Sequence, residues 1–129
     1  MDRIPRDFLS DNKHKIEILI IDDSSADDTV NLSNKYIIEN SELPITIFKN
    51  PENQGYGGNQ KIGYFYMLKQ NFDIVILLHG DGQYAPEYIP TLVDPILKNE
   101  ADVVFGSRMI NKKEALKGGM PLYKYFGNQ

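Results

Sequence analysis

The stretch that decides the fold is Ile16-Glu17-Ile18-Leu19-Ile20-Ile21-Asp22-Asp23-Ser24-Ser25. Its apolar part is short and rich in β-branched residues, which is typical of a strand covered on both faces. Three further apolar runs follow along the 129-residue chain, and the four begin at a constant step of 29 residues. Each interval is long enough for one helix, so the spacing predicts βαβ units, a mostly parallel sheet flanked by helices, and an α/β fold. The four runs are Ile16–Ile21, Ile45–Phe48, Ile74–Leu78 and Val103–Phe105.

Composition restricts the class of protein. The chain is 41% hydrophobic and 25% charged and has no Cys, which excludes a disulfide framework, a thiolate zinc site and a cysteine nucleophile. Its apolar runs are far shorter than the roughly 20 residues that a membrane span needs, and the N-terminus shows no export signal. We therefore expect residues 1–129 to form a single cytoplasmic domain.

The charges are distributed unevenly along the chain. The net charge is −4, with +4 in residues 108–129 and −8 in the preceding part. An acidic body disfavours a nucleic-acid partner, because binding to phosphates needs a basic surface. The basic tail suits a phosphorylated ligand or an anionic membrane surface, so we expect a peripheral location at the inner face of the membrane. The alternative is a solvated, mobile C-terminus.

Polar residues or glycines follow every apolar run directly. In open parallel sheets, ligands bind outside the carboxyl ends of the strands, so the candidate functional residues are expected there. The four segments are Asp22–Ser25, Asn50–Asn59, His79–Gln83 and Gly106–Arg108.

His79-Gly80-Asp81-Gly82-Gln83 is a candidate metal site. Alternate residues of an extended segment point the same way, so His79, Asp81 and Gln83 could converge on one ion. An imidazole, a carboxylate and an amide oxygen would suit Mn²⁺ or Mg²⁺, with substrate phosphates completing the shell. The alternative is a simple turn in which Asp81 bonds its own backbone.

The residues after the first two apolar runs could bind a ligand or have only a structural role. Asp22 and Asp23 could hydrogen-bond a nucleobase or a ribose, or hold a metal; alternatively, one of them caps the following helix. The Gly-rich stretch after Asn53 contains Gly55 and Gly58, whose N–H groups could bind an anion before a helix, although most such glycines only make turns.

Arg108 follows the last apolar run. An arginine fork can grip a phosphate in two places, whereas the alternative is a surface ion pair with a neighbouring carboxylate.

Taken in order, these blocks resemble the family 2 glycosyltransferases, closest to the branch that transfers mannose or glucose to polyprenyl or dolichyl phosphate. The matching blocks cover about Glu17 to Asn128. They are Leu19-Ile20-Ile21-Asp22-Asp23-Ser24-Ser25, Asn53-Gln54-Gly55-Tyr56-Gly57-Gly58-Asn59, Gly80-Asp81-Gly82-Gln83 and Gly106-Ser107-Arg108, with Gly118-Gly119 beyond.

This resemblance implies a GT-A fold, a nucleotide-diphosphate sugar donor, and an inverting transfer helped by Mn²⁺ or Mg²⁺. By position, Asp23 would bind the nucleobase or ribose, with Asp22 nearby and Asn53, Gly55 and Gly58 in the donor loop. Arg108 would face the donor phosphates or a phosphorylated acceptor such as a lipid phosphate, and residues 107–129 would be a basic segment on the acceptor side. No catalytic residue is assigned.

Asp81 matches the second acid of the family's Asp-x-Asp metal motif and Gln83 the amide two residues later. The first acid of that motif is His79 here.

The first 15 residues contain no strand, so we expect a fragment that lacks the fold's opening strand and its C-terminal part. An unpaired sheet edge invites self-association. Two alternative functions stay open: an inactive nucleotide-binding fragment, and a phosphoacceptor receiver domain. The receiver domain would need its acceptor aspartate at the position of His79.

Overall fold

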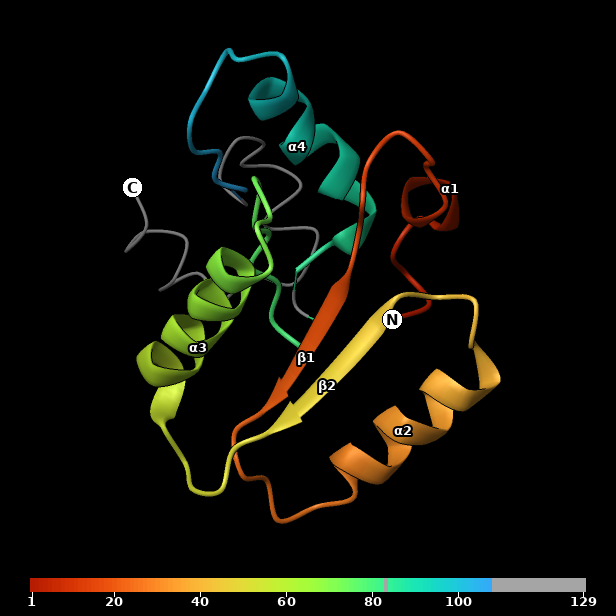
Figure 1. Cartoon of the computed structure of the whole chain (residues 1–129), viewed down its shortest axis with the longest axis vertical. Coiled ribbons are helices and arrows are strands. Elements are labelled where there is room, and N and C mark those ends of the chain that lie inside the picture. The colour runs from red at the N-terminus through yellow and green to blue at the C-terminus, as the bar shows by residue number, and fades with distance from the viewer. Residues whose placement is uncertain (83, 108–129) are drawn as a thin grey trace, which may run out of the picture. The chain divides into compact units, whose positions relative to one another are not determined.

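The computed structural model describes residues 1–82 and 84–107. The chain forms two compact units, residues 1–87 and residues 88–129, and each is considered by itself. In the first unit, two strands lie side by side with their carboxyl ends at the same edge (Figure 1). The elements in chain order are α1 (Arg6–Leu9), β1 (Ile18–Asp22), α2 (Thr29–Glu39), β2 (Ile45–Lys49), α3 (Gly55–Lys69), the 3-10 turn η1 (Pro86–Tyr88) and α4 (Ile89–Leu97).

β1 and β2 pair in parallel, with Ile18 opposite Ile45 and Asp22 opposite Lys49. The ladder continues past the end of β1, where Asn50 N donates to Asp22 O at 2.9 Å. α2 packs on β2, and α3 packs on β1 (Figure 1). The first two predicted strands and the helices after them are thereby confirmed.

α3 covers the face of the sheet that carries Ile21 and Phe48. Gly63 lies against the Ile21 side chain, where an added Cβ would be 3.5 Å from Cδ1. The ring of Tyr66 meets Phe48 edge-on, with 5.2 Å between ring centroids. This packing fixes where α3 begins relative to the end of β1.

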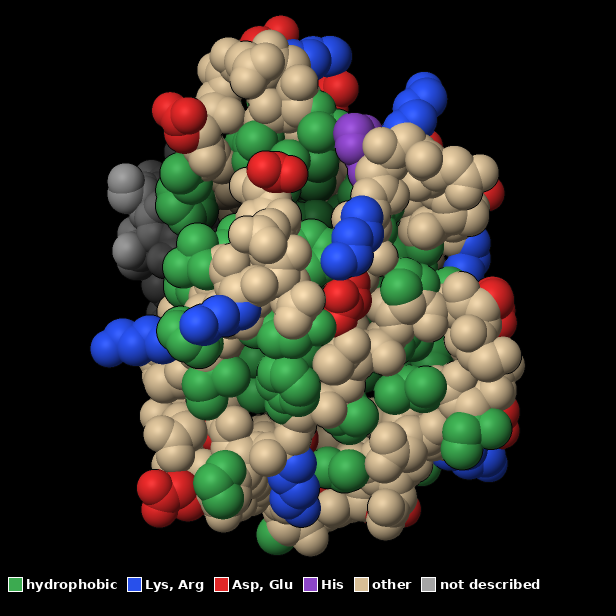
Figure 2. Space-filling view, in the orientation of Figure 1, with side chains coloured by type: hydrophobic (Ala, Val, Ile, Leu, Met, Phe, Trp, Pro, Cys, Tyr) green, Lys and Arg blue, Asp and Glu red, His purple; other side chains and the backbone are tan. Residues whose placement is uncertain are grey.

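The two later predicted strands are wrong for the residues that the structure describes. Ile74–Leu78 and Val103–Phe105 have no strand partner, and the described sheet contains only β1 and β2. Val75 to Leu78 are 37–50% exposed and Phe105 is 86% exposed, and apolar side chains reach the surface at several places (Figure 2). β-branched composition gives a run strand propensity, but a strand forms only where a neighbouring edge accepts its hydrogen bonds.

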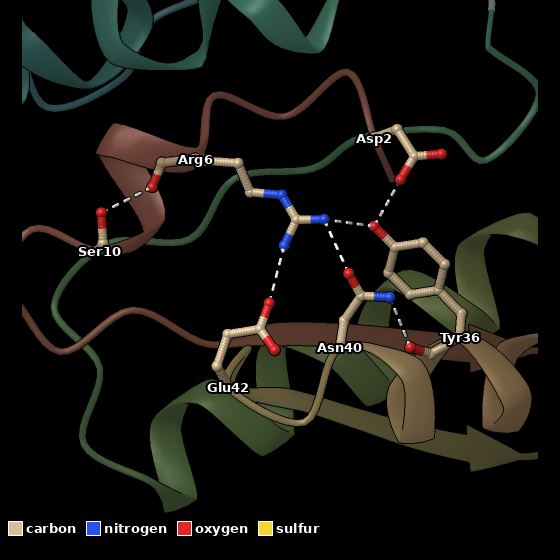
Figure 3. Close-up of polar contacts among 6 residues, drawn as sticks. All are labelled: Asp2, Arg6, Ser10, Tyr36, Asn40 and Glu42. Carbon is tan, nitrogen blue, oxygen red and sulfur yellow. Dashed lines mark hydrogen bonds and ion pairs between the residues drawn. The ribbon is translucent and has the colours of Figure 1, made fainter.

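A polar network ties the N-terminal segment to α2 (Figure 3). Arg6 Nη2 donates to Tyr36 Oη at 3.0 Å and to Asn40 Oδ1 at 2.9 Å. The Tyr36 hydroxyl donates in turn to Asp2 at 2.7 Å, and Arg6 Nη1 reaches Glu42 at 3.5 Å. Burial and the bond to Asp2 raise the pKa of Tyr36, so the hydroxyl stays a donor at neutral pH.

A second arginine holds the loop that follows Asp81. Arg3 Nε and Nη2 donate to the two carboxylate oxygens of Glu87 at 2.6 and 3.1 Å. Arg3 Nη1 donates to Gly82 O at 3.1 Å. Gly82 has φ +71°, a conformation that favours glycine. The turn is therefore supported both by a glycine at position 82 and by the hydrogen bond from Arg3. The N-terminal segment therefore helps to place the Asp81 turn.

An open hollow of about 750 Å³ lies around the start of β2. Glu17 Oε1 accepts hydrogen bonds there from Thr46 Oγ1 at 2.6 Å and Tyr66 Oη at 2.5 Å. These bonds join the segment before β1 to β2 and α3, and apolar side chains such as Ile37 and Leu43 line the rest. The polar groups of the hollow thus have a structural role at the opposite ends of the strands from Asp23.

The Arg3–Glu87 pair predicts a pH-dependent contribution to stability. Its hydrogen bond to Arg3 lowers the pKa of Glu87 below the ordinary value of 4.5, so the pair stabilises the folded chain above that pH and less below it. Glu87→Gln should lower Tm at neutral pH by about a degree or two, because the pair is half exposed. Calorimetry should show this difference shrinking as the pH falls through the pKa of Glu87.

Glu52→Gln is the matched control, since the Glu52 side chain is exposed and forms no ion pair among the described residues. A Glu87→Gln effect that stays constant from neutral to acidic pH would contradict the assignment.

Candidate functional site

Asp22 and Asp23 lie at the carboxyl end of β1 but have different environments. Asp22 is 5% exposed, and its carboxylate accepts hydrogen bonds from Ser25 N at 3.2 Å and from the Ser25 hydroxyl. These bonds close the turn after β1, in which Ser24 has φ +62°. Neither acid caps α2, which begins at Thr29. Asp22 therefore stabilises the turn, and its predicted contact with a donor stays a prediction.

Asp23 points its carboxylate at the loop after β2. Its Oδ1 accepts from Gln54 N at 2.8 Å and from Asn50 Nδ2 at 2.8 Å. These bonds, the Gln54 amide first, hold the pKa of Asp23 below its ordinary value, so the group is anionic at neutral pH. Both of these bonds end on Oδ1, and the Gly55 N–H also lowers the pKa of Asp23. A carboxylate offers about four acceptor positions, so the group has capacity to accept a further hydrogen bond from a ligand.

Asn50 is the centre of this site, and the sequence interpretation assigned it no role. It is 6% exposed, and its Nδ2 donates both to Asp23 and to Asn59 Oδ1, at 2.8 and 2.7 Å. Asn59 Nδ2 donates to Ile21 O at 3.3 Å, so α3 is tied back to β1. In the sequence, Asn50 is only an asparagine that directly follows a strand. Its burial and its two partners become evident only when the pairing of β1 and β2 is known.

The Gly-rich stretch is partly loop and partly helix. Asn53 Oδ1 accepts from Gly55 N at 2.9 Å, and Asn53 Nδ2 donates to Asp23 O at 3.3 Å. Gly55 has φ +69° and begins α3, so Gly57 and Gly58 lie in its first turn rather than in the loop before it. Gly58 is needed for space, since a Cβ there would be 2.7 Å from Gln54 Cβ. Asn53 and Gly55 thus shape the loop around Asp23, and Gly58 leaves room for Gln54 in the first turn of α3.

His79 contacts the same loop. Its Nε2 lies 3.2 Å from the Tyr56 hydroxyl, and its ring centroid lies 5.1 Å from that of Tyr56 and 5.0 Å from that of Tyr84. A chain of contacts therefore runs from Asp23 through Gln54 and Tyr56 to His79, two residues before Asp81. The segments after β1, after β2 and after the 74–78 run meet in this way.

The predicted metal ligands are only partly visible. Within residues 1–82 and 84–107, no group of three or more His, Asp or Glu side chains could hold an ion. Gln83 and Arg108 lie outside the described residues, so their predicted roles remain untested. Among the predicted ligands that the structure describes, Asp81 is the one carboxylate. It lies two residues after His79, which contacts Tyr56 of the Gly-rich stretch. Such a donor set fits Mg²⁺ or Mn²⁺ where one carboxylate and substrate phosphates supply the ligands.

Residues 3–126 match the model of glycosyl transferase family 2. The chain belongs to this family. The predicted family and α/β class are confirmed, and the receiver-domain alternative is wrong. Members of family 2 generally depend on a divalent metal.

Similar proteins include three enzymes with named activities. The chain is 31% identical to UDP-N-acetylglucosamine--dolichyl-phosphate N-acetylglucosaminyltransferase of Methanococcus voltae, over 91% of this chain and 50% of that protein. It is 26% identical to undecaprenyl-phosphate mannosyltransferase of Micrococcus luteus, over 79% and 40% respectively. It is 33% identical to dolichyl-phosphate beta-glucosyltransferase of Dictyostelium discoideum, over 76% and 30%.

The chain thus spans about half the length, or less, of the curated relatives it matches. No solved structure gives a significant match. No helix among residues 1–82 and 84–107 is long and apolar enough to cross a bilayer.

Asn50→Ala tests whether this amide organises the family 2 site. Removing a buried donor with two partners should lower the free energy of unfolding by about 1–3 kcal/mol, measured by urea denaturation. The pKa of Asp23 should also rise toward its ordinary value, which NMR titration of its carboxyl carbon can follow. Asn12→Ala is the control because Asn12 is exposed and has no side-chain hydrogen bond among the described residues. Equal effects of the two substitutions would contradict the role of Asn50.

Proposed function

We propose that the protein carrying this chain is an inverting glycosyltransferase that moves a sugar from a nucleotide-diphosphate sugar to a polyprenyl phosphate. Family membership supports glycosyl transfer, and the names of the similar enzymes support a polyprenyl or dolichyl phosphate acceptor. The observation in this chain that carries the proposal is Asp23. It is an anionic carboxylate held by the loop after β2, with capacity to accept a further hydrogen bond.

The donor would lie across the carboxyl ends of β1 and β2. Asp23 Oδ2 would accept hydrogen bonds from the ribose or nucleobase, which are neutral donors that a fixed carboxylate binds well. The diphosphate would extend toward Asp81, and Arg108 is a further candidate for binding it. The loop that holds Asp23 and the loop that ends at Asp81 are already linked through Tyr56 and His79.

Mn²⁺ or Mg²⁺, when bound by Asp81 with Gln83, would stabilise the negative charge that develops on the departing diphosphate. The sugar's bond to the diphosphate oxygen breaks, and a bond to the acceptor oxygen forms. A lipid phosphate oxygen is anionic already, so it needs no strong general base.

The acceptor side would involve the basic segment at 107–129, five of whose residues are Lys or Arg. Its charge suits a peripheral position at the cytoplasmic face of a membrane that displays lipid phosphates. Co-sedimentation with anionic vesicles, reduced by added salt, would support this location, and equal recovery with neutral vesicles would contradict it.

We also propose self-association through the sheet. Among the described residues, β1 pairs with β2 alone, and Val75 to Leu78 are 37–50% exposed. Leu77→Lys should shift the chain toward monomer in sedimentation velocity, because Leu77 belongs to an exposed apolar run and a charge there opposes its burial against a second copy. A monomer at all concentrations for the unsubstituted chain would end this part of the proposal.

The donor site is tested by ligand-induced stabilisation. UDP or GDP with Mn²⁺ should raise Tm by several degrees at about one hundred times Kd, because binding to the folded state adds about 2.7 kcal/mol. Asp81→Asn and Asp23→Asn should each abolish most of that shift. Asp73→Asn, at an exposed acid without a partner among the described residues, should leave it unchanged.

A chain that binds nucleotide but shows no transfer from UDP- or GDP-sugars would match the inactive-fragment alternative. No Tm shift with either nucleotide at saturating ligand and metal would overturn donor binding itself.

A further inference from the structure

His79 stands at the position of the first acid in the Asp-x-Asp metal motif of family 2. The contacts of its side chain are with two tyrosines. Its Nε2 lies 3.2 Å from the Tyr56 hydroxyl. The ring planes of His79 and Tyr56 are tilted by 38°, with 5.1 Å between centroids, and those of His79 and Tyr84 by 47°, with 5.0 Å. These separations are within the range in which aromatic rings attract each other. One ring nitrogen of His79 therefore lies within hydrogen-bond distance of a tyrosine hydroxyl, and its ring contacts the rings of two tyrosines.

We propose that His79 is a positioning residue that couples the Gly-rich loop to the Asp81 turn, rather than a metal ligand. The proposal rests on the proposed function, because the two loops matter together only if they share a nucleotide-sugar ligand. It departs from the sequence interpretation, which placed His79 beside Asp81 and Gln83 around an ion.

Tyr56 is well placed to carry this coupling. It is the second residue of α3, and it follows Gly55, whose N–H is bound by Asn53 at 2.9 Å. The preceding Gln54 N–H is bound by Asp23 at 2.8 Å. A shift of Tyr56 would therefore move the backbone that holds the Asp23 carboxylate. The Tyr56 hydroxyl also contacts His79, in the segment that leads to Asp81.

The Asp81 turn is held from a second side. Arg3 Nη1 donates to Gly82 O at 3.1 Å, so the turn lies between an arginine contact after Asp81 and the His79–Tyr56 contact before it. A Cβ added at Gly80 would meet nothing within 4 Å. Contacts on both sides of Asp81 thus help to place the turn, and the His79 contact joins it to the Gly-rich loop.

A double-substitution cycle separates positioning from ligation. Tyr56→Phe removes the hydroxyl and keeps the ring, and His79→Phe keeps a ring and removes the nitrogen. The third variant combines both changes. Tyr64→Phe is the matched control on the same helix, because Tyr64 is 41% exposed and makes no side-chain hydrogen bond among the described residues. Each chain is titrated with UDP and with GDP at saturating Mn²⁺, and then with Mn²⁺ at a nucleotide concentration that saturates that variant, because the two ligands bind in a linked way.

Positioning predicts that Tyr56→Phe and His79→Phe each weaken nucleotide binding by about three- to tenfold, the range expected for one lost hydrogen bond. The combined variant should be no weaker than either single one, because both remove the same contact. The Mn²⁺ midpoint should be unchanged in all of them. In the free chain, the amide NMR shifts of residues 79–82 should change on Tyr56→Phe and not on Tyr64→Phe.

Ligation predicts a different pattern. His79→Phe would then move the Mn²⁺ midpoint by about tenfold or more, Tyr56→Phe would leave it in place, and the two effects would add. That result overturns the proposal, as does the absence of any effect of Tyr56→Phe on nucleotide binding and on the shifts of residues 79–82. If the unsubstituted chain binds neither nucleotide, the proposed function fails. The shift comparison in the free chain then decides alone whether His79 and Tyr56 are coupled.

Discussion

The parallel pairing of β1 with β2 is the constraint on which the rest of the site depends. Because Asp22 lies opposite Lys49, Asp23 and Asn50 follow the two strands at the same edge of the sheet. Asn50 N also donates a hydrogen bond to Asp22 O. A shift of one residue would turn the side chains of β1 to the opposite face and separate Asp23 from Asn50. The register is set mainly by the apolar residues of the two strands, so a property of the core places a polar site at its edge.

Most of the polar groups at this edge bind one another before any ligand arrives. Asn50 donates to Asp23 and Asn59, and Gln54 N donates to Asp23 as well. A carboxylate fixed in this way need not reorganise when a ribose or base approaches, which favours binding. Asp22, one residue earlier, has both oxygens occupied by Ser25 and supports the turn. Two adjacent acids with the same chemistry thus differ because only one of them faces the neighbouring loop.

Local patterns in the sequence were sufficient for β1, β2 and the helix after the Gly-rich stretch. They were insufficient for Ile74–Leu78, since a strand needs a partner edge that composition does not reveal. Asn50 was overlooked for a similar reason, because its role comes from residues 27 positions before it and nine positions after it. For His79, spacing suggested a metal ligand, which stays a prediction, and spacing gave no sign of its contact with Tyr56 of α3. Contacts between distant segments are what a single sequence hides.

Paramagnetic broadening tests the location of the donor site most directly. Amide spectra of the chain would be recorded with UDP or GDP while Mn²⁺ replaces Mg²⁺, because Mn²⁺ broadens the signals of nearby nuclei. Our account predicts that the amides of Asp23, Gln54 to Tyr56 and His79 to Gly82 broaden first, at low Mn²⁺. Broadening that begins instead around the hollow at Glu17 and Thr46, or that is uniform along the chain, would contradict a shared donor site at the carboxyl ends of β1 and β2.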